Sequence, residues 1–268
     1  MTNISDAGSI LKIRGLEVVF EAAHGPVKAV DGIDLDVRRH EVLGIVGESG
    51  SGKTVTALSV LRLIRSPGKI TAGSISFDGS DLLNATEDRM RAIRGARISM
   101  VFQEPAAALD PVFTAGYQIK EAALAHGKMD ARTAKEAAIG LLKAVHVKDP
   151  ERVCSSYPHQ LSGGVRQRVC IAASLINSPE LVIMDEPTTA LDVTVQCGIL
   201  DLISEIAADR KISILFISHD LGVISRISSR IAVMRRGRVV EAADRDKILK
   251  DPSEEYTRSL VSSARALS

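Results

Sequence analysis

The first part of the chain alternates between apolar and polar positions. The alternation covers residues 11–14 and 30–37, with a turn-rich piece around residues 24–26 between them, and it returns over residues 73–79. A period of two places successive side chains on opposite faces of a sheet. These segments are therefore predicted to form antiparallel β-strands.

Largely apolar segments of strand length follow, at residues 42–46, 97–102, 181–184 and 212–218, and the one at 181–184 is uninterrupted. Such runs are typical of parallel strands that are covered on both faces. Helical patterns occupy residues 55–64, 165–176 and 195–208, and an alanine-rich helical stretch extends from about 116 to 147, with Asp130 as the expected N-cap of a helix over 131–145. Residues 231–241 have the pattern of a hairpin. Together these patterns predict an α/β core with an antiparallel β subdomain and a helical insertion.

A glycine-rich segment joins the run at 42–46 to the helix at 55–64. Its residues are Gly47, Glu48, Ser49, Gly50, Ser51, Gly52, Lys53 and Thr54, which match the phosphate-loop pattern G-x-x-x-x-G-K-[ST]. Glycine lets backbone N–H groups point inward at a phosphate, and the helix start adds unpaired N–H groups. Lys53 is expected to reach the β- and γ-phosphates of a nucleotide, and the Thr54 hydroxyl is expected to bind Mg²⁺. The loop alone does not separate an ATPase from a GTPase or a small-molecule kinase.

Polar residues follow three of the other apolar runs. Asp185 and Glu186 close the run at 181–184, Gln103 follows the run at 97–102, and His219 follows the run at 212–218. The carboxyl ends of parallel strands form the edge at which such a sheet binds its ligand. Asp185 is expected to bind Mg²⁺ and Glu186 to polarise the water that attacks the γ-phosphate. The alternatives are a solvated acidic turn, a structural histidine and, at Gln103, a polar loop start.

A second helix also begins on glycine. Ser162 has the residue type of an N-cap, and Gly163 and Gly164 precede the helix at 165–176. Two glycines at a helix start are costly unless a group must approach the backbone closely, so this is a second candidate anion site, with an ordinary cap as the alternative. Upstream, Phe20 is a candidate to stack on a nucleotide base, with His24 as its rival and a core position as an equally open explanation.

Length and composition narrow the classes of function. The 268 residues are 45% hydrophobic and 25% charged, and the net charge of +1 gives no reason to expect a nucleic-acid partner. No apolar run approaches the length of a membrane span, and the N-terminus has neither a basic start nor an apolar signal core. Cys154, Cys170 and Cys197 lack metal-ligand spacing and are expected to be reduced thiols.

The order of these motifs resembles that of the nucleotide-binding subunits of ABC transporters. Residues 47–54 resemble the Walker A motif of that family, Gln103 its Q-loop, residues 161–164 its signature motif, residues 181–186 its Walker B motif with the catalytic glutamate, residues 190–192 its D-loop, and His219 its switch histidine. The resemblance runs from about residue 10 to residue 250. It implies a P-loop NTPase (RecA-like) ATPase domain over residues 1–250, with a helical subdomain at about 104–165 and a short tail at 251–268.

The resemblance also implies a mechanism in which two ATPase subunits face each other head to tail. ATP and Mg²⁺ on Walker A of one subunit are capped by Ser162, Gly163 and Gly164 of the other. Gln103 is expected to contact the metal and to couple closure to the membrane partners. His219 is expected to hold the γ-phosphate and to orient Glu186 or the attacking water.

Three segments narrow the resemblance to the oligopeptide, dipeptide and nickel importer branch, namely residues 101–105, 157–164 and 185–196. This implies two transmembrane permease subunits, a second ATPase subunit that is a sibling chain rather than a second copy, and an external solute-binding protein. The expected place is peripheral, on the cytoplasmic face of the bacterial inner membrane. Peptides are the expected cargo, with nickel or another small solute still open.

The sequence departs from that branch at three places. Val165 stands where Gln or Met is usual, and Glu254 and Glu255 precede Tyr256 where the branch tends to have His-Pro. The chain also stops at Ser268 without a cysteine-containing tail, so no iron–sulfur cluster is expected.

Three rival functions fit the residues less well. A non-transport ABC ATPase of DNA repair, chromosome organisation or translation is disfavoured by the near-neutral charge, the lack of a long heptad run and a length that holds one such domain. A GTPase or small-molecule kinase does not need residues 161–164 or His219. A regulatory subunit without turnover is disfavoured because Lys53, Asp185, Glu186 and His219 are all present.

Overall fold

The computed structural model describes residues 8–127, 129–189 and 191–266. The chain divides into two compact units, one formed by residues 1–90 with 211–268 and the other by residues 91–210. In the sequence, helix α2 (Glu87–Ile93) spans the junction between them.

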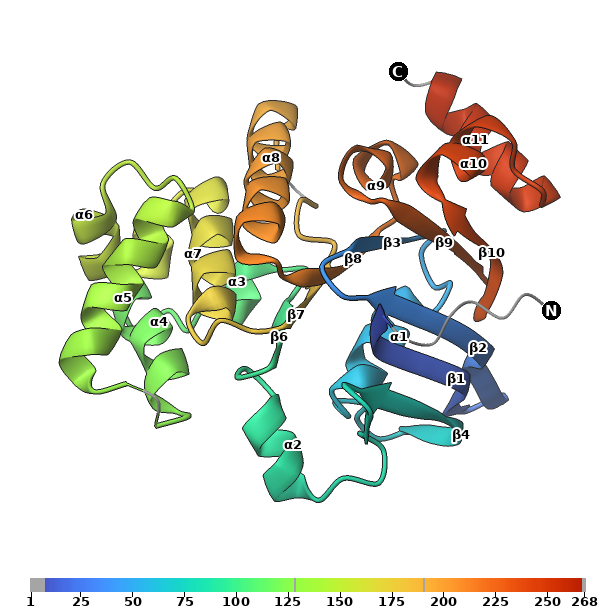
Figure 1. Ribbon diagram of the computed structural model, residues 1–268, viewed down its shortest axis with the longest axis horizontal. Helices are drawn as coiled ribbons and strands as arrows, with labels where there is room; N and C mark the ends of the chain where they lie inside the picture. Colours follow the sequence, from blue (N-terminus) through green and yellow to red (C-terminus); the bar gives the residue numbers. More distant parts are fainter. Residues whose placement is uncertain (1–7, 128, 190, 267–268) are drawn as a thin grey trace. The chain divides into compact units, whose positions relative to one another are not determined.

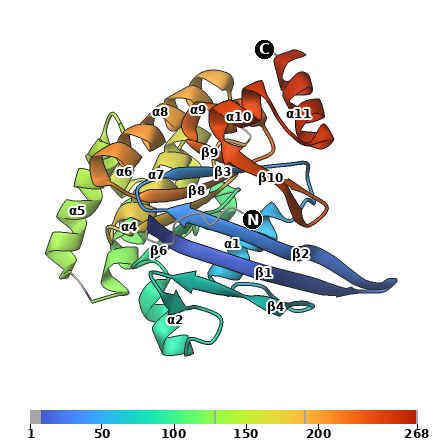
Figure 2. The same ribbon diagram turned by 45° about the vertical axis from the view of Figure 1, so that its right-hand side comes forward.

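The first unit contains an antiparallel sheet in the strand order β2-β1-β4-β5. The strands are β1 (Ser9–Ala22), β2 (Gly25–Arg38), β4 (Gly68–Phe77) and β5 (Ser80–Asp81). The long β1 and β2 run beside each other to the turn at residues 23–24, with β4 on the other side of β1 (Figure 2). Leu11, Ile13, Val18 and Phe77 are buried on this sheet, so the alternating pattern correctly predicted an antiparallel sheet.

The same unit holds the parallel strands that position the candidate site. Strand β3 (Val42–Val46) pairs in parallel with β8 (Ser213–Ser218) and with β9 (Arg230–Arg235). Strand β10 (Arg238–Asp244) is antiparallel to β9, and the hairpin between them turns at Arg236 and Gly237 as predicted. Helix α9 (Leu221–Ile227) packs on β3 and β8, helix α10 (Arg245–Lys250) packs on β9 and β10, and helix α11 (Glu255–Ala266) contacts both helices (Figure 1).

Helix α1 (Lys53–Val60) differs from the expectation of a helix over 55–64. It begins two residues earlier, on the phosphate-loop lysine itself. It ends earlier because Arg62 adopts the left-handed conformation (φ 52°), and the Leu63 N–H donates to the Leu58 carbonyl at 2.9 Å. This reversal uses the last carbonyls of the helix and turns the chain toward β4.

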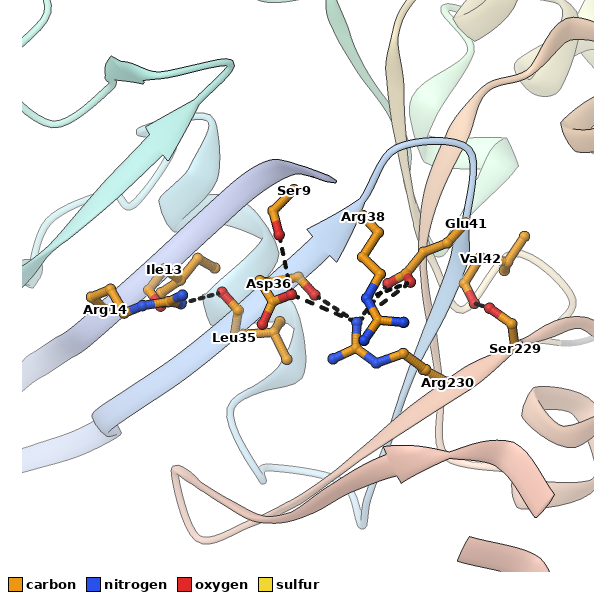
Figure 3. Close-up of polar contacts among 10 residues, drawn as sticks. All are labelled: Ser9, Ile13, Arg14, Leu35, Asp36, Arg38, Glu41, Val42, Ser229 and Arg230. Atoms are coloured by element: carbon orange, nitrogen blue, oxygen red, sulfur yellow. Dashed lines mark hydrogen bonds and ion pairs between the residues drawn. The ribbon is translucent and has the colours of Figure 1, made fainter. Parts of the chain in front are cut away.

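A buried ion pair ties β9 to the segment that joins β2 to β3 (Figure 3). Arg230 Nη1 lies 2.9 Å from Glu41 Oε1 and 3.7 Å from Asp36 Oδ2, and the Arg230 and Glu41 side chains are 10% and 9% exposed. Burial raises the pKa of Glu41 above its ordinary value, although the nearby Arg230 acts to lower it. The charge of Arg230 therefore offsets the cost of keeping two carboxylates out of water.

The second unit pairs β6 (Ile98–Val101) in parallel with β7 (Leu181–Asp185) and adds a group of helices. The helices are α3 (Pro105–Ala108), α4 (Ala115–Leu124), α5 (Ala131–Ala144), α6 (Pro150–Ser155), the short 3₁₀ helix η2 (Pro158–Gln160), α7 (Gly163–Leu175) and α8 (Val193–Arg210). Helices α4 to α7 pack on one another (Figure 1). Asp130 caps α5 as predicted, because its side chain accepts from the Thr133 N–H at 2.7 Å.

No helix in the described ranges is both long enough and apolar enough to span a bilayer.

Candidate active site

The phosphate loop lies between β3 and α1, where the sequence predicted it. Gly52 is the N-cap of α1 in the left-handed conformation, with φ 102°, and a Cβ at this position would come within 2.5 Å of the Ala29 carbonyl oxygen. A Cβ at Gly47 would come within 2.1 Å of the Met234 carbonyl oxygen. Only glycine fits these two positions, so the loop is packed against β2 and the end of β9 as well as shaped for a ligand.

Lys53, the first residue of α1, folds its side chain back onto the phosphate loop. Its Nζ donates to the Gly47 carbonyl at 2.8 Å and to the Glu48 carbonyl at 3.0 Å, and the residue is only 5% exposed. These bonds hold a buried positive charge at the centre of the loop. An ammonium held in this place is suited to a polyphosphate.

The Ser51 side chain also indicates that the loop binds a ligand. Its hydroxyl is buried and has no hydrogen-bond partner among the described residues. A buried hydroxyl without a partner is unfavourable unless a ligand or water supplies one. Its backbone carbonyl is paired, because the Gly237 N–H donates to it at 3.0 Å.

His219 follows β8 at the same sheet edge as the phosphate loop. Val46 and Ser218 are register partners in the parallel β3–β8 pair, so Gly47 and His219 leave neighbouring strands at the same level. His219 is exposed and contributes to a cavity of about 550 Å³ together with residues of α9 and α11. The pattern of strand ends therefore correctly placed these two residues at one edge.

The second unit brings two of the predicted residues together and adds a third. Gln103 Nε2 lies 3.4 Å from Glu186 Oε2, and the Thr189 hydroxyl donates to the same oxygen at 2.8 Å. Glu186 has φ 47°, a conformation that is uncommon for glutamate, and it follows Asp185, which is 2% exposed at the end of β7. Thr189 was missed in the sequence, although its position three residues after Glu186 was the available signal.

The signature segment begins α7. Ser162 is its N-cap but makes no side-chain capping bond, and Ser162 and Gly163 are exposed. A Cβ on Gly164 would come within 2.6 Å of Val195 Cγ1, whereas a Cβ on Gly163 would meet Leu191 Cδ2 at 3.6 Å, an ordinary contact. Packing of α7 on α8 therefore explains Gly164 but leaves Gly163 without a packing reason.

The two candidates for base stacking lie in the β1–β2 hairpin. Phe20 is half-buried in β1, and its ring packs on Gly68, where an added Cβ would be 2.5 Å from Phe20 Cε1. His24 is exposed in the turn. Neither role is tested by this geometry, and both stay predictions.

The predicted magnesium ligands are oxygen donors. Thr54 offers a hydroxyl, Gln103 an amide oxygen and Asp185 a carboxylate, which is the donor chemistry that Mg²⁺ prefers. Thr54 belongs to the first unit and the other two to the second. Within the described ranges, no group of three or more His, Cys, Asp or Glu side chains forms a metal cluster.

Comparison with known proteins decides the family. The family model described as ABC transporter matches residues 30–189. The chain belongs to this family. It is 46% identical to a probable peptide ABC transporter ATP-binding protein, y4tR, of Sinorhizobium fredii, over 96% of this chain and 77% of that protein. It is 43% identical to the dipeptide transport ATP-binding protein DppD of Bacillus subtilis, again over 96% of this chain and 77% of that protein.

Solved structures agree with the family assignment. A dimeric ATP-binding cassette, MJ0796, in a post-hydrolysis state with ADP and phosphate, matches with a TM-score of 0.78 and 27% identity over 87% of this chain and 98% of that one. The predicted P-loop NTPase fold is therefore confirmed, and so is the prediction that the chain is an ATP-binding ATPase. The roles of individual site residues stay predictions.

Proposed function

We propose that this ABC ATPase powers an importer of peptides, with ATP and Mg²⁺ held at the residues described above. The observation that carries the proposal is the similarity to peptide and dipeptide transport ATP-binding proteins, at 43% to 46% identity over nearly the whole chain. Nickel or another small solute remains the alternative cargo, because the ATPase subunit does not itself bind the cargo in this scheme.

The local geometry supports the following proposed residue roles. Lys53 binds the β- and γ-phosphates together with N–H groups from residues 49–54, and Thr54, Gln103 and Asp185 supply oxygen ligands to Mg²⁺. Glu186 acts as general base toward the attacking water, and the bonds from Gln103 and Thr189 orient its carboxylate. His219, at the edge that β3 and β8 share, contacts the γ-phosphate.

A second ATPase subunit completes each site. The exposed Ser162 and Gly163 present the N-terminus of α7, a helix of 13 residues, to a ligand. The anion for this helix start is the γ-phosphate of ATP bound to the partner subunit. ATP thus stabilises the closed pair, and its hydrolysis releases it. The partner is a sibling chain, as in the branch that the sequence resembles.

Exposed apolar side chains between residues 102 and 113, on either side of Gln103, support a membrane partner. Phe102, Val112 and Phe113 are 44%, 67% and 42% exposed. Phe102 also lines a cavity of about 280 Å³ with Leu109, Gln118 and Cys170. Large exposed apolar residues beside a hollow are typical of a protein–protein contact surface. We assign this surface to the two transmembrane permeases, which hold the ATPase at the cytoplasmic face of the bacterial inner membrane and receive cargo from an external solute-binding protein.

A pull-down tests the transport function. Tagged Glu186→Gln protein is recovered from detergent-solubilised membranes in the presence of ATP, and the co-purifying proteins are identified by mass spectrometry. Two multi-span permeases and a second ATPase are expected, and all three should be recovered at lower yield from the matched Lys53→Ala protein, which does not form the ATP-closed pair. Recovery of ribosomal or DNA-bound proteins, or of no partner, would overturn the transport function but not the ATPase chemistry.

A further inference from the structure

The start of helix α11 is fixed to strand β10 in the first unit. The Glu241 carboxylate accepts from the backbone N–H of Ser253 at 2.8 Å and of Glu254 at 3.1 Å, and Thr257 is fully buried one turn later. Burial opposes the charge of Glu241, but the hydrogen bonds from the Ser253 and Glu254 N–H groups act against it, and the pKa of Glu241 is lowered. Since the carboxylate is ionised near neutral pH, these bonds are charge-assisted and hold the helix start in place.

Tyr256 extends from this fixed point to the phosphate loop. The Glu48 N–H donates to the Tyr256 hydroxyl over 3.3 Å, although the two residues are 208 positions apart in the chain. The Arg235 guanidinium lies 4.6 Å from the centroid of the Tyr256 ring, and Arg235 Nε lies 4.0 Å from Glu48 Oε1. Arg235, at the end of β9, therefore packs on the face of the Tyr256 ring and also attracts the Glu48 carboxylate.

The loop is thus held by the protein at two places. Gly237, in the β9–β10 turn, donates to the Ser51 carbonyl, and the Asp31 N–H in turn donates to the Gly237 carbonyl at 2.8 Å. Tyr256 holds the opposite limb of the loop at Glu48. A phosphate loop binds through several backbone N–H groups at once, so its affinity depends on their being arranged before the ligand arrives.

We propose that Tyr256 is a positioning residue for ATP, and that its hydroxyl keeps the phosphate loop in the nucleotide-binding conformation. The proposal rests on the proposed assignment of residues 47–54 as the phosphate site. Tyr256 does not touch the reacting atoms. It acts through Glu48, so its loss weakens binding of the nucleotide and leaves the chemical step intact.

Tyr256→Phe tests the hydroxyl alone, because the ring and its contact with Arg235 remain. The Kd for ATP is measured by calorimetry, and KM and kcat are measured for hydrolysis. We expect Kd and KM to rise about 3- to 10-fold, the range of one net hydrogen bond, with kcat and the melting temperature unchanged. The matched control is Tyr117→Phe, which removes a tyrosine hydroxyl from α4 in the other unit and is expected to leave Kd and KM unchanged.

Lys53→Ala distinguishes failure of the proposed phosphate site from failure of the positioning role of Tyr256. If Lys53→Ala loses ATP and Tyr256→Phe binds it as tightly as the parent protein or more tightly, the role of Tyr256 is overturned and the phosphate site stands. A 3- to 10-fold fall of kcat in Tyr256→Phe with no change in Kd also overturns the positioning role of Tyr256. If Lys53→Ala binds ATP normally, the phosphate site itself fails and the positioning role fails with it.

Discussion

The Gln103 side chain, just after β6, donates from Nε2 to Glu186 Oε2, just after β7, over 3.4 Å. The Thr189 hydroxyl donates to the same oxygen at 2.8 Å. Two donors thus set the direction of one carboxylate. We propose that movement of Gln103 on partner binding reorients Glu186, the proposed general base, and so couples partner contact to hydrolysis.

Glu186→Gln is expected to bind ATP normally and to hydrolyse it more slowly, by about 10²- to 10⁴-fold. The amide keeps the size of the side chain but cannot accept a proton from the attacking water. Because ATP then persists, the protein is expected to accumulate as a closed dimer, seen as an ATP-dependent shift in size-exclusion chromatography.

Glu136→Gln is the matched control for that variant. Glu136 lies on α5 and its carboxylate pairs with Arg132 at the surface. Its loss should leave turnover and elution volume unchanged. Near-normal turnover in Glu186→Gln would show that Glu186 is not the base.

The two signature glycines should respond differently to alanine. In Gly164→Ala the new Cβ would lie 2.6 Å from Val195 Cγ1, so α7 must shift from α8, at a cost of about 1–3 kcal/mol. In Gly163→Ala the nearest neighbour of the new Cβ would be Leu191 Cδ2 at 3.6 Å, so folding is not disturbed. We nevertheless expect Gly163→Ala to lose ATP hydrolysis, since its Cβ would block the phosphate of the partner subunit.

The melting temperature and the rate of ATP hydrolysis are measured for both glycine variants to test these expectations. Val195→Ala should restore the melting temperature of Gly164→Ala by making room for the methyl group. Full turnover in Gly163→Ala at all protein concentrations would argue that the signature helix start binds no anion across a dimer.

Local patterns in the sequence predicted the sheet edges and the residues that follow them. Val46 and Ser218 end apolar runs, and the structure pairs them in register, so the neighbourhood of Gly47 and His219 followed from strand order alone. Asp130 was predictable for the same reason, because an N-cap acts on an N–H three residues away. Such features depend on short stretches of chain whose chemistry is visible in the residue types.

Contacts between distant segments could not be predicted. Tyr256 meets Glu48 only because β9, β10 and α11 return the chain to the loop, and no period or motif encodes that distance. Thr189 gave a weak local signal, since a threonine in a turn is ordinary until its hydroxyl is seen to face Glu186. The end of α1 was missed because Arg62 adopts the left-handed conformation, which its residue type does not signal.

Arg230→Met should destabilise the first unit by about 3–5 kcal/mol, because it leaves Glu41 and Asp36 without their buried cation. The loss should depend on pH. Burial raises the pKa of Glu41, so its contribution to the free energy of unfolding is fully present below the unfolded value and is lost as pH rises through the folded value. Removing Arg230 raises that pKa further, and the deficit should therefore be larger at pH 8 than at pH 5.

Urea unfolding at the two pH values measures the effect. The matched control is Arg132→Met, whose ion pair with Glu136 is exposed and should not contribute measurably. An equal deficit at both pH values would show that lost packing, and not the uncompensated carboxylates, explains the destabilisation.

Cys170 should be nearly inert to thiol reagents in the folded protein. It lies on α7 as a free thiol, and burial raises the pKa of Cys170 to about 12, from 9.0 for an ordinary thiol. Only the thiolate reacts, so at pH 8 its alkylation should be about 1,000-fold slower in the folded chain than in concentrated urea. The rate should rise about tenfold per pH unit up to the raised pKa. The contribution of Cys170 to the free energy of unfolding is fully present below pH 9 and is lost as pH rises through 12.

Mass spectrometry of the peptide that carries Cys170 after timed iodoacetamide labelling gives the alkylation rate, and equal labelling of folded and unfolded protein would contradict burial of this thiol.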